Sequence, residues 1–167
     1  MSIIGGRPTE RRIAAHLIVP NGARAVEFLR AALGGELLYK SEMPGGQIVH
    51  AQVRVEESTV MVTEEMLQER GESSDDRFGV KLASPHSLGG TTMMIELYVA
   101  DVDATFARAV AAGGTEVVAP QEMFYGDRYG VLRDPFGHLW ALATPLEALT
   151  ADEVNRRATA LFAPPPS

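Results

Sequence analysis

The chain has 167 residues and no cysteine, which suits one domain or two fused modules and excludes disulfides and thiolate chemistry. Its formal net charge of -7 argues against nucleic acid as a partner, because clustered Lys and Arg would be needed to meet the phosphates. The start lacks the apolar stretch of a signal peptide, and no apolar run approaches the roughly 18 residues that a membrane helix requires. We therefore expect a cytoplasmic protein with no membrane partner.

The first part of the chain predicts a strand, a helix and three further strands. Asn21 follows a short apolar segment and is a good N-cap for a helix whose apolar residues recur at helical spacing. Gly34 and Gly35 end that helix. The predicted strands lie at residues 14–20, 36–40, 47–55 and 59–64.

The second part repeats this order. Asp101 is the predicted N-cap of its helix, which ends at Gly113 and Gly114. The predicted strands lie at residues 94–99, 116–119, 124–133 and 138–144. The sequence therefore predicts an α+β fold of two tandem βαβββ modules, at residues 14–65 and 92–145.

Three further segments lie outside the modules. Residues 1–13 predict a disordered tail, and residues 66–91 are polar and rich in Gly and Ser, which fits either a linker or a mobile flap over a cavity. Residues 146–167 predict a C-terminal helix and tail, because Thr150 and Glu153 have the spacing of a capping box.

The two modules are copies of one unit. A constant shift that places Ala15 on Ile95 aligns the chain with itself without a gap, as far as Glu64 on Thr144. Two copies are too few for a solenoid. They can instead face each other across a shared cavity, and such cavities bind small molecules.

Strand alternation divides the side chains of each module between its helix and the predicted cavity. If His16 and its counterpart Glu96 face the cavity, so do Ile18, Met61, Thr63, Tyr98, Leu139 and Ala141. The residues predicted to face the helices are Leu17, Val19, Val60, Val62, Leu97, Val99, Trp140 and Leu142. His50 on the third strand and Tyr125 near the rim complete the predicted ligand-binding set. This lining is mostly apolar, so we expect a small organic ligand that is held by burial and oriented by a few polar groups.

The stretch MFYGDRYGVLRDPFGHLW at residues 123–140, together with the paired modules, resembles the vicinal oxygen chelate superfamily. Within it, the chain is similar to the PhnB-like, glyoxalase and bleomycin-resistance-related branch. The resemblance implies a homodimer in which strands of two modules curl into a half-barrel around each pocket, often with modules exchanged between chains. It also implies either simple binding of a small molecule or a metal-dependent lyase, isomerase or dioxygenase reaction.

The resemblance further implies four metal-ligand positions, which fall on His16, Met61, Glu96 and Ala141. Only the imidazole and the carboxylate suit a divalent metal, and two protein ligands make a weak site. We therefore expect no tightly bound cofactor and at most weakly held Zn, Ni, Mn or Fe on His16 and Glu96, with His50 as the candidate third ligand.

Three functions follow from these residues. The leading hypothesis is a binding protein with an incomplete metal site, and the rival is a metal-dependent enzyme that uses His16 and Glu96. Because Glu96 lies in an apolar strand, its carboxylate is also the candidate general base of a metal-free reaction. His86 and His138 are predicted to be exposed to solvent or to stabilise turns. Asp127, Arg128, Arg133 and Asp134 are predicted to form an ion-pair set that holds the loop and turn, with an anionic ligand as the alternative partner of Arg128.

Overall fold

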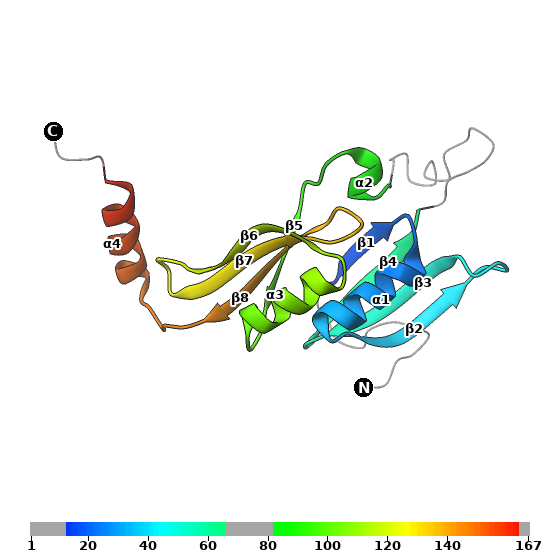
Figure 1. The fold of residues 1–167 in the computed structure, drawn as a ribbon, viewed down its shortest axis with the longest axis horizontal. Helices are drawn as coiled ribbons and strands as arrows, with labels where there is room; N and C mark the ends of the chain where they lie inside the picture. Colours follow the sequence, from blue (N-terminus) through cyan, green and yellow to red (C-terminus); the bar gives the residue numbers. More distant parts are fainter. Residues whose placement is uncertain (1–12, 66–81, 164–167) are drawn as a thin grey trace.

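The computed structural model describes residues 13–65 and 82–163 and contains the predicted order of elements twice (Figure 1). The first module consists of β1 (Ala15–Val19), α1 (Gly22–Leu33), β2 (Glu36–Glu42), β3 (Ile48–Val55) and β4 (Ser58–Glu64). The second consists of β5 (Met94–Tyr98), α3 (Val102–Ala111), β6 (Thr115–Glu122), β7 (Asp127–Arg133) and β8 (Leu139–Pro145). A short helix α2 (Pro85–Leu88) lies between them, and α4 (Ala151–Phe162) follows. The predicted N-terminal tail and most of the predicted linker or flap lie outside the described residues.

Each module forms its own four-stranded sheet, and the two sheets have the same topology. The strand orders are β1-β4-β3-β2 and β5-β8-β7-β6, and in both sheets the first strand runs parallel to the last while the other pairs are antiparallel. The predicted tandem βαβββ fold is therefore confirmed.

Both module helices begin with the same capping interaction. The side chain of Asn21 accepts a hydrogen bond from the backbone N–H of Arg24 at 2.9 Å, and Asp101 accepts one from Ala104 at 3.0 Å. Each bond satisfies a backbone donor that the first helical turn leaves free. The constant shift that aligns the two halves places Asn21 on Asp101, so the caps are equivalent, as the predicted duplication requires.

The gap-free alignment of the two halves is wrong in their middle. It places Val60 on Trp140 and Val53 on Arg133. Val53 pairs with Val60 across β3 and β4, but the residue that pairs with Trp140 is Leu132, one position before Arg133. One residue is therefore missing from the second module before β7, and one is added back in the turn between β7 and β8.

The missing residue belongs to the end of the module helix. In α1, the N–H of Gly35 bonds to the carbonyl of Leu29, six residues earlier, whereas Gly114 bonds to the carbonyl of Ala109, five residues earlier. Because the second helix ends one residue sooner, β6 and β7 lie one position earlier in the sequence than the constant shift predicts. Gly35 and Gly114 nevertheless occupy equivalent places, because a Cβ on either would clash with the helix carbonyl that it approaches.

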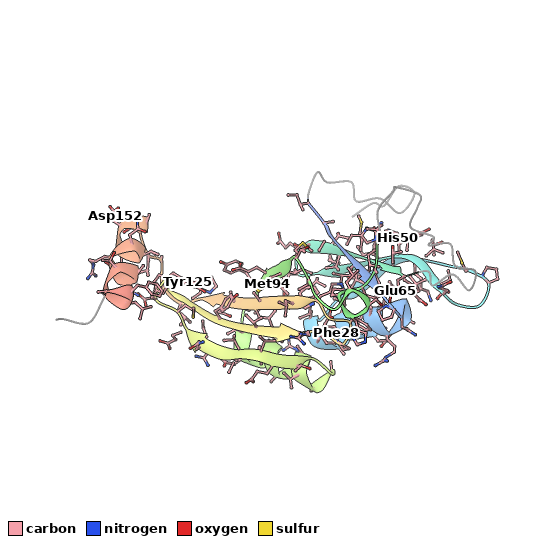
Figure 2. All side chains as sticks on the ribbon, turned by 90° about the horizontal axis from the view of Figure 1, so that it is seen from above. Phe28, His50, Glu65, Met94, Tyr125 and Asp152 are labelled. Carbon is pink, nitrogen blue, oxygen red and sulfur yellow. The ribbon has the colours of Figure 1, made fainter. Side chains whose placement is uncertain are left out.

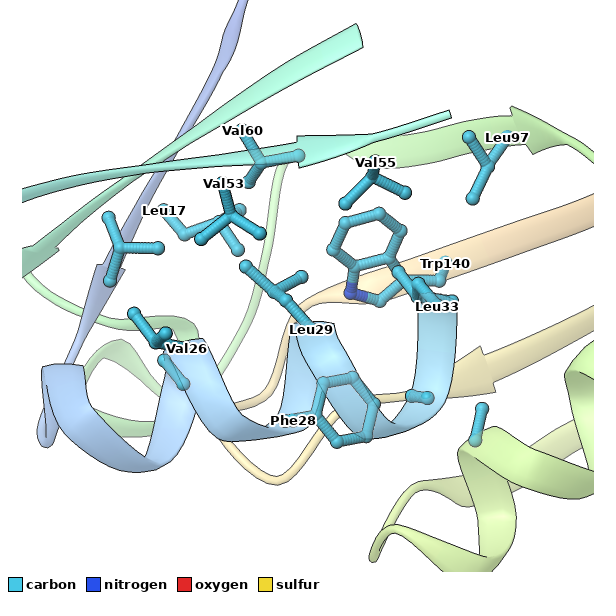
Figure 3. Packing of buried hydrophobic residues seen from close by; sticks show 14 of the residues in the cluster. Leu17, Val26, Phe28, Leu29, Leu33, Val53, Val55, Val60, Leu97 and Trp140 are labelled. Atoms are coloured by element: carbon cyan, nitrogen blue, oxygen red, sulfur yellow. The ribbon is translucent and has the colours of Figure 1, made fainter. Parts of the chain in front are cut away.

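The hydrophobic core is one cluster that spans both modules on the helix side of the sheets. Figure 1 shows α1 and α3 side by side, and these helices form the principal contact between the modules. Trp140 of β8 is 1 % exposed and lies beside Leu33 and Val55 of the first module (Figure 3). The two modules are thus held together through their helices and not through the opposite faces of their sheets.

Hydrogen bonds attach the start of α2 to the end of the first module. The buried carboxylate of Glu65 accepts bonds from the backbone N–H of Ser84 at 2.9 Å, from the hydroxyl of Ser84 at 3.2 Å and from the hydroxyl of Ser87 at 2.7 Å. Burial alone would raise the pKa of Glu65, but these hydrogen bonds outweigh it and lower the pKa. The charged carboxylate therefore fixes the position of α2, a helix that the sequence did not predict.

Helix α4 follows the second module and projects from its end (Figure 1). Thr150 caps it by accepting a bond from the backbone N–H of Glu153 at 3.3 Å, as predicted. The Glu153 carboxylate pairs with Arg156 and Arg157, and Arg157 also pairs with Glu147 at 2.8 Å. Ion pairs hold α4 in place, and no side chain of this helix is buried.

Candidate functional site

Each sheet has one face covered by its helix and a second face that we call the open face. All eight residues predicted to point toward the helices are at most 9 % exposed and belong to the core cluster. The predicted alternation of the strands is therefore confirmed. His16 pairs with Met61 across β1 and β4, and Glu96 pairs with Ala141 across β5 and β8, so all four predicted ligand positions lie on the open faces.

The open face of the first module carries a cluster of two imidazoles with hydrogen-bonding neighbours. The Nε2 atom of His16 lies 2.8 Å from the hydroxyl of Thr63, and the rings of His16 and His50 meet edge to face at 5.8 Å. The side-chain nitrogen of Gln52 lies 3.3 Å from Nε2 of His50, and the ring of Tyr39 lies 6.3 Å from that of His50. Partial burial lowers the pKa of His16, and the neighbouring His50 lowers it further. The cluster therefore favours a neutral imidazole at His16.

The open face of the second module carries carboxylates and phenols instead. The hydroxyl of Tyr98 donates to the carboxylate of Asp127 at 3.3 Å. Desolvation raises the pKa values of Tyr98, Tyr125 and Tyr129, and the negative charge of Glu96 raises all three further. Glu96 therefore influences a group of phenols that remain protonated and can donate hydrogen bonds.

The thioether of Met94 and a second aromatic ring complete this group. The hydroxyl of Tyr129 lies 3.8 Å from the sulfur of Met94, and the rings of Phe124 and Tyr125 meet edge to face at 5.2 Å. Tyr129 lies opposite Ala143, the counterpart of Thr63, so it occupies the place that His50 has in the first module. The two modules thus present different chemistry from matching positions.

Within one chain, the two clusters are separate. In Figure 2, His50 lies over the first sheet, whereas Met94 and Tyr125 lie over the second. The interactions of His16 are with Thr63 and His50 of the first module, whereas Glu96 acts on Tyr98, Tyr125 and Tyr129 of the second. The expectation that the imidazole and the carboxylate meet in a hollow inside a single chain is not met. The reason is that the modules pack through α1 and α3, which turns the open faces outward.

A metal ion does not fit the donors of one chain. Residues 13–65 and 82–163 contain no group of three or more His, Asp or Glu side chains that could hold a metal. Among the predicted ligand positions, Met61 supplies only a thioether, and Ala141 is fully buried and supplies no donor. No catalytic step through a metal is derived from this arrangement.

The remaining predicted binding residues are distributed along the open faces. Ile18, Met61 and Thr63 are half-buried on the first sheet, and Tyr98 is 55 % exposed on the second. Leu139, at the start of β8, lines a separate cavity beside α2. Gln52, Asp127 and Met94 were not predicted as site residues. Alternation from His50 would have identified Gln52, which lies two positions further along β3.

Several polar residues have structural roles. The carboxylate of Glu64 accepts bonds from the backbone N–H groups of Gly22 and Ile48 at 2.9 and 3.3 Å, so it caps α1 and points away from Met61, as alternation predicts. His138 is buried, and its Nδ1 lies 3.0 Å from the carboxylate of Asp134, which agrees with its predicted place in a turn.

The predicted ion-pair set of the β7 region is wrong. Arg128 pairs with Asp103 of α3 at 2.6 Å, and Asp127 accepts the Tyr98 hydroxyl. Asp134 is buried and holds the following turn, and Arg133 makes no ion pair with any described residue. Sequence proximity suggested pairing among neighbours, but alternation along β7 sends successive side chains to opposite faces.

None of the helices in the described part of the chain has the length and apolar character to cross a bilayer.

Comparison with known proteins identifies the family. Residues 12–142 match the glyoxalase/bleomycin resistance protein/dioxygenase superfamily. The uncharacterized protein Mb0911c of Mycobacterium bovis is 39% identical over 146 residues, which cover 87% of this chain and 91% of that protein. The crystal structure of TioX from Micromonospora sp. ML1 is 30% identical, has a TM-score of 0.61 and covers 82% of this chain and 100% of its own.

A glyoxalase-related enzyme from Fulvimarina pelagi has a TM-score of 0.63 at 17% identity, with 86% of this chain and 95% of that chain covered, which shows a common fold. The family match covers both modules and the segment between them. The chain therefore belongs to the glyoxalase/bleomycin resistance protein/dioxygenase superfamily.

Proposed function

We propose that this protein is a homodimeric binding protein for a small organic molecule. In the proposed dimer, the open face of the first module of one chain lies against the open face of the second module of its partner. Each of the two resulting sites then combines the His16 cluster of one chain with the Glu96 cluster of the other. A cytoplasmic location fits a chain that has no cysteine.

One observation carries this proposal: each open face exposes large apolar and aromatic side chains beside a cluster of polar groups. Large side chains that ordinarily lie inside a protein or an interface are exposed there, with Tyr98 at 55 %, Met94 at 45 % and Tyr39 at 40 %. Contiguous exposed groups of this kind mark binding or association surfaces. A second copy would cover them and bring the imidazoles and the carboxylate to one place.

The side chains also suggest how the ligand would be held. Ile18 and Met61 offer apolar surface on one face, while the phenols around Glu96 offer hydrogen-bond donors on the other. Gln52 and Asp127 make the combined lining more polar than the sequence suggested. We infer that a few polar groups orient a ligand whose remaining surface is buried, as in most small-molecule sites.

A metal-dependent lyase, isomerase or dioxygenase is the second candidate. The observation in its favour is that His16 and Glu96 occupy equivalent register positions, opposite Met61 and Ala141, in the two sheets. In the proposed dimer, His16 and His50 of one chain would be joined by the partner's Glu96 carboxylate. Elemental analysis of protein purified without chelators decides between the two: near-stoichiometric Zn, Ni, Mn or Fe that is lost in His16→Ala would favour the enzyme.

The dimer is tested by complementation. Wild type is first measured by size-exclusion chromatography with light scattering, and a ligand is identified by a thermal-shift screen. His16→Ala and Glu96→Gln chains are then co-expressed with different tags and purified as the mixed dimer. If sites combine modules from different chains, one of the two sites in the mixed dimer is intact and ligand binds at half the wild-type stoichiometry.

The control shows the stoichiometry expected when one of the two sites is lost and the other is intact. Pairing His16→Ala with Glu116→Gln, a change at an exposed position outside the open face, should give the same half stoichiometry. A mixed dimer of His16→Ala and Glu96→Gln that binds no ligand would mean that each site lies within one chain. A monomer at micromolar concentration would contradict the proposal altogether.

A further inference from the structure

A cavity lies outside both open-face clusters, between α2 and the turn that joins β7 to β8. Its volume is about 330 Å³, and the residues that line it include His86, Gly89, Gly90, Thr91, Arg133 and Leu139. Arg133 and Leu139 are paired residues of β7 and β8, so they form one wall. The α2 segment forms the other wall. The cavity is thus complete within a single chain.

Both walls are fixed by hydrogen bonds and close packing. The backbone N–H of His86 donates to the carbonyl of Phe136 at 3.2 Å. Gly137 passes so close that a Cβ there would lie 2.9 Å from the His86 nitrogen, and its φ of +97° also favours glycine. On the far side, Ser84 at the start of α2 is held by the Glu65 carboxylate. The cavity is therefore preformed, as ligand sites usually are.

The turn that carries this wall is also rigid. The buried carboxylate of Asp134 accepts bonds from the backbone N–H groups of Phe136 and His138, both at 2.9 Å, and from the indole N–H of Trp140 at 3.1 Å. These bonds turn the charge of Asp134 inward, toward donors of its own turn. Asp134 is therefore not available to neutralise Arg133, its neighbour in the sequence.

The ionisable residues of the cavity lining are basic. They are an arginine and a histidine, and no Asp or Glu belongs to the described lining. Five other described arginines pair with carboxylates: Arg30, Arg54, Arg128, Arg156 and Arg157. Arg133 has no such partner among the described residues. Glu65 is a carboxylate that interacts electrostatically with His86, and both of its oxygens accept bonds from Ser84 or Ser87.

We propose that this cavity binds a small anion, either a phosphate or a carboxylate, through the guanidinium of Arg133 and the imidazole of His86. A guanidinium presents parallel N–H donors that match the oxygens of both groups. The volume is near the lower limit for a small-molecule site, which suits a small anion or the anionic end of a larger ligand. This site does not depend on the proposed dimer, because a single chain supplies every residue.

The test uses the full-length protein labelled with ¹⁵N, at constant ionic strength in a chloride buffer. Inorganic phosphate and succinate are titrated separately, and the amide signals of Gly89, Gly90, Thr91 and Gly137 are followed. At least one of the two anions should shift these signals saturably in the millimolar range. The anion that binds more tightly identifies the source, phosphate or carboxylate.

Variants connect the binding to the named side chains. Arg133→Gln should weaken it by about tenfold, because it removes the charge-assisted bonds, and His86→Gln should weaken it by a smaller factor. Both residues are exposed, so the variants are expected to fold, and circular dichroism checks this. Arg24→Gln, at an exposed arginine of α1 that is also without an ion pair to a described residue, should leave the affinity unchanged.

The proposal is overturned if neither anion shifts these signals saturably, or if Arg133→Gln binds as tightly as wild type. It is also overturned if Arg24→Gln weakens binding as much as Arg133→Gln, because the effect would then be that of net charge alone. A failure here would leave the dimer and its open-face sites untouched, since neither Arg133 nor His86 belongs to the His16 or Glu96 cluster.

Discussion

The two sides of the sheets have changed to different extents since the duplication. On the helix side, counterparts remain apolar and buried, as with Val62 and Leu142, both of which are fully buried. On the open side, the imidazole of His16 has the carboxylate of Glu96 as its counterpart. Side chains on the helix side must fill the core, which restricts them to apolar residues of suitable size. Side chains on the open side are restricted only where they bind a ligand or another chain.

This difference explains how one fold unit can form an asymmetric site from two copies of itself. Identical open faces would offer two equal sets of donors. Here the first module offers the imidazoles of His16 and His50, and the second offers a carboxylate with protonated phenols. A ligand held between them would meet a different chemistry on each side, which fixes its orientation.

The largest effect is expected at Trp140, which joins the helix sides of the two modules. Trp140→Ala removes a fully buried indole from a core shared with Leu33 and Val55, so it should reduce the free energy of unfolding by about 3–5 kcal/mol. Urea denaturation measures the change. Val60→Ala, at the counterpart position in the first module, is the matched control and should cost less. Equal losses would mean that Trp140 does not connect the modules.

Asp134 should give the next largest effect. Asp134→Ala leaves three buried donors, two backbone N–H groups and the Trp140 indole, without their acceptor. Each unsatisfied buried group costs about 1–3 kcal/mol, and partial access of water reduces their sum, so we expect a loss of about 3 kcal/mol. Asp127→Ala, on the open face, should change stability by less than about 0.5 kcal/mol. A small effect of Asp134→Ala would show that water replaces the carboxylate.

Sequence reasoning predicted the fold and the facing of each strand because alternation and capping are local. The duplication placed Asn21 and Asp101 correctly, and alternation separated Trp140 from Glu96. The glycines at the ends of the two module helices indicate the one-residue offset, but the gap-free alignment does not match them. That alignment places Gly35, which ends the first module helix, on Thr115, one position past its true counterpart Gly114.

No local sequence pattern indicates how the two open faces are arranged relative to each other. Alternation determines which face a side chain occupies, but not whether two sheets face each other or turn outward. That depends on how α1 packs against α3, through residues far apart in the sequence. The attachment of α2 by Glu65 was missed for the same reason, since the bonded residues lie 19 positions apart.

A smaller effect is expected from Glu65, whose carboxylate holds the wall of the anion cavity. Glu65→Gln removes a charged acceptor of three hydrogen bonds and should cost about 1–2 kcal/mol at pH 7. Because folding lowers the pKa of Glu65, its stabilisation is present above the ordinary glutamate pKa and is lost as the pH falls through the lowered value. The difference between wild type and variant should therefore shrink below about pH 4. Urea titrations at pH 7 and at pH 3.5 measure both quantities, and a difference that is independent of pH would contradict this role.

The smallest effect on stability is expected at His16. This effect depends on pH, which distinguishes a residue of the open face from the apolar residues of the core. Folding lowers the pKa of His16, so the unfolded chain takes up a proton first, and the stability contributed by the neutral imidazole is lost as the pH falls below about 6.5. His16→Gln should therefore lose less stability than wild type between pH 7.5 and pH 5.5, while the two should differ by a constant amount above pH 7.5. If a second chain covers the cluster, burial of His16 increases, and the pH dependence of wild type should become steeper at higher protein concentration. A dependence that is the same at all concentrations would place His16 on a surface that no partner covers.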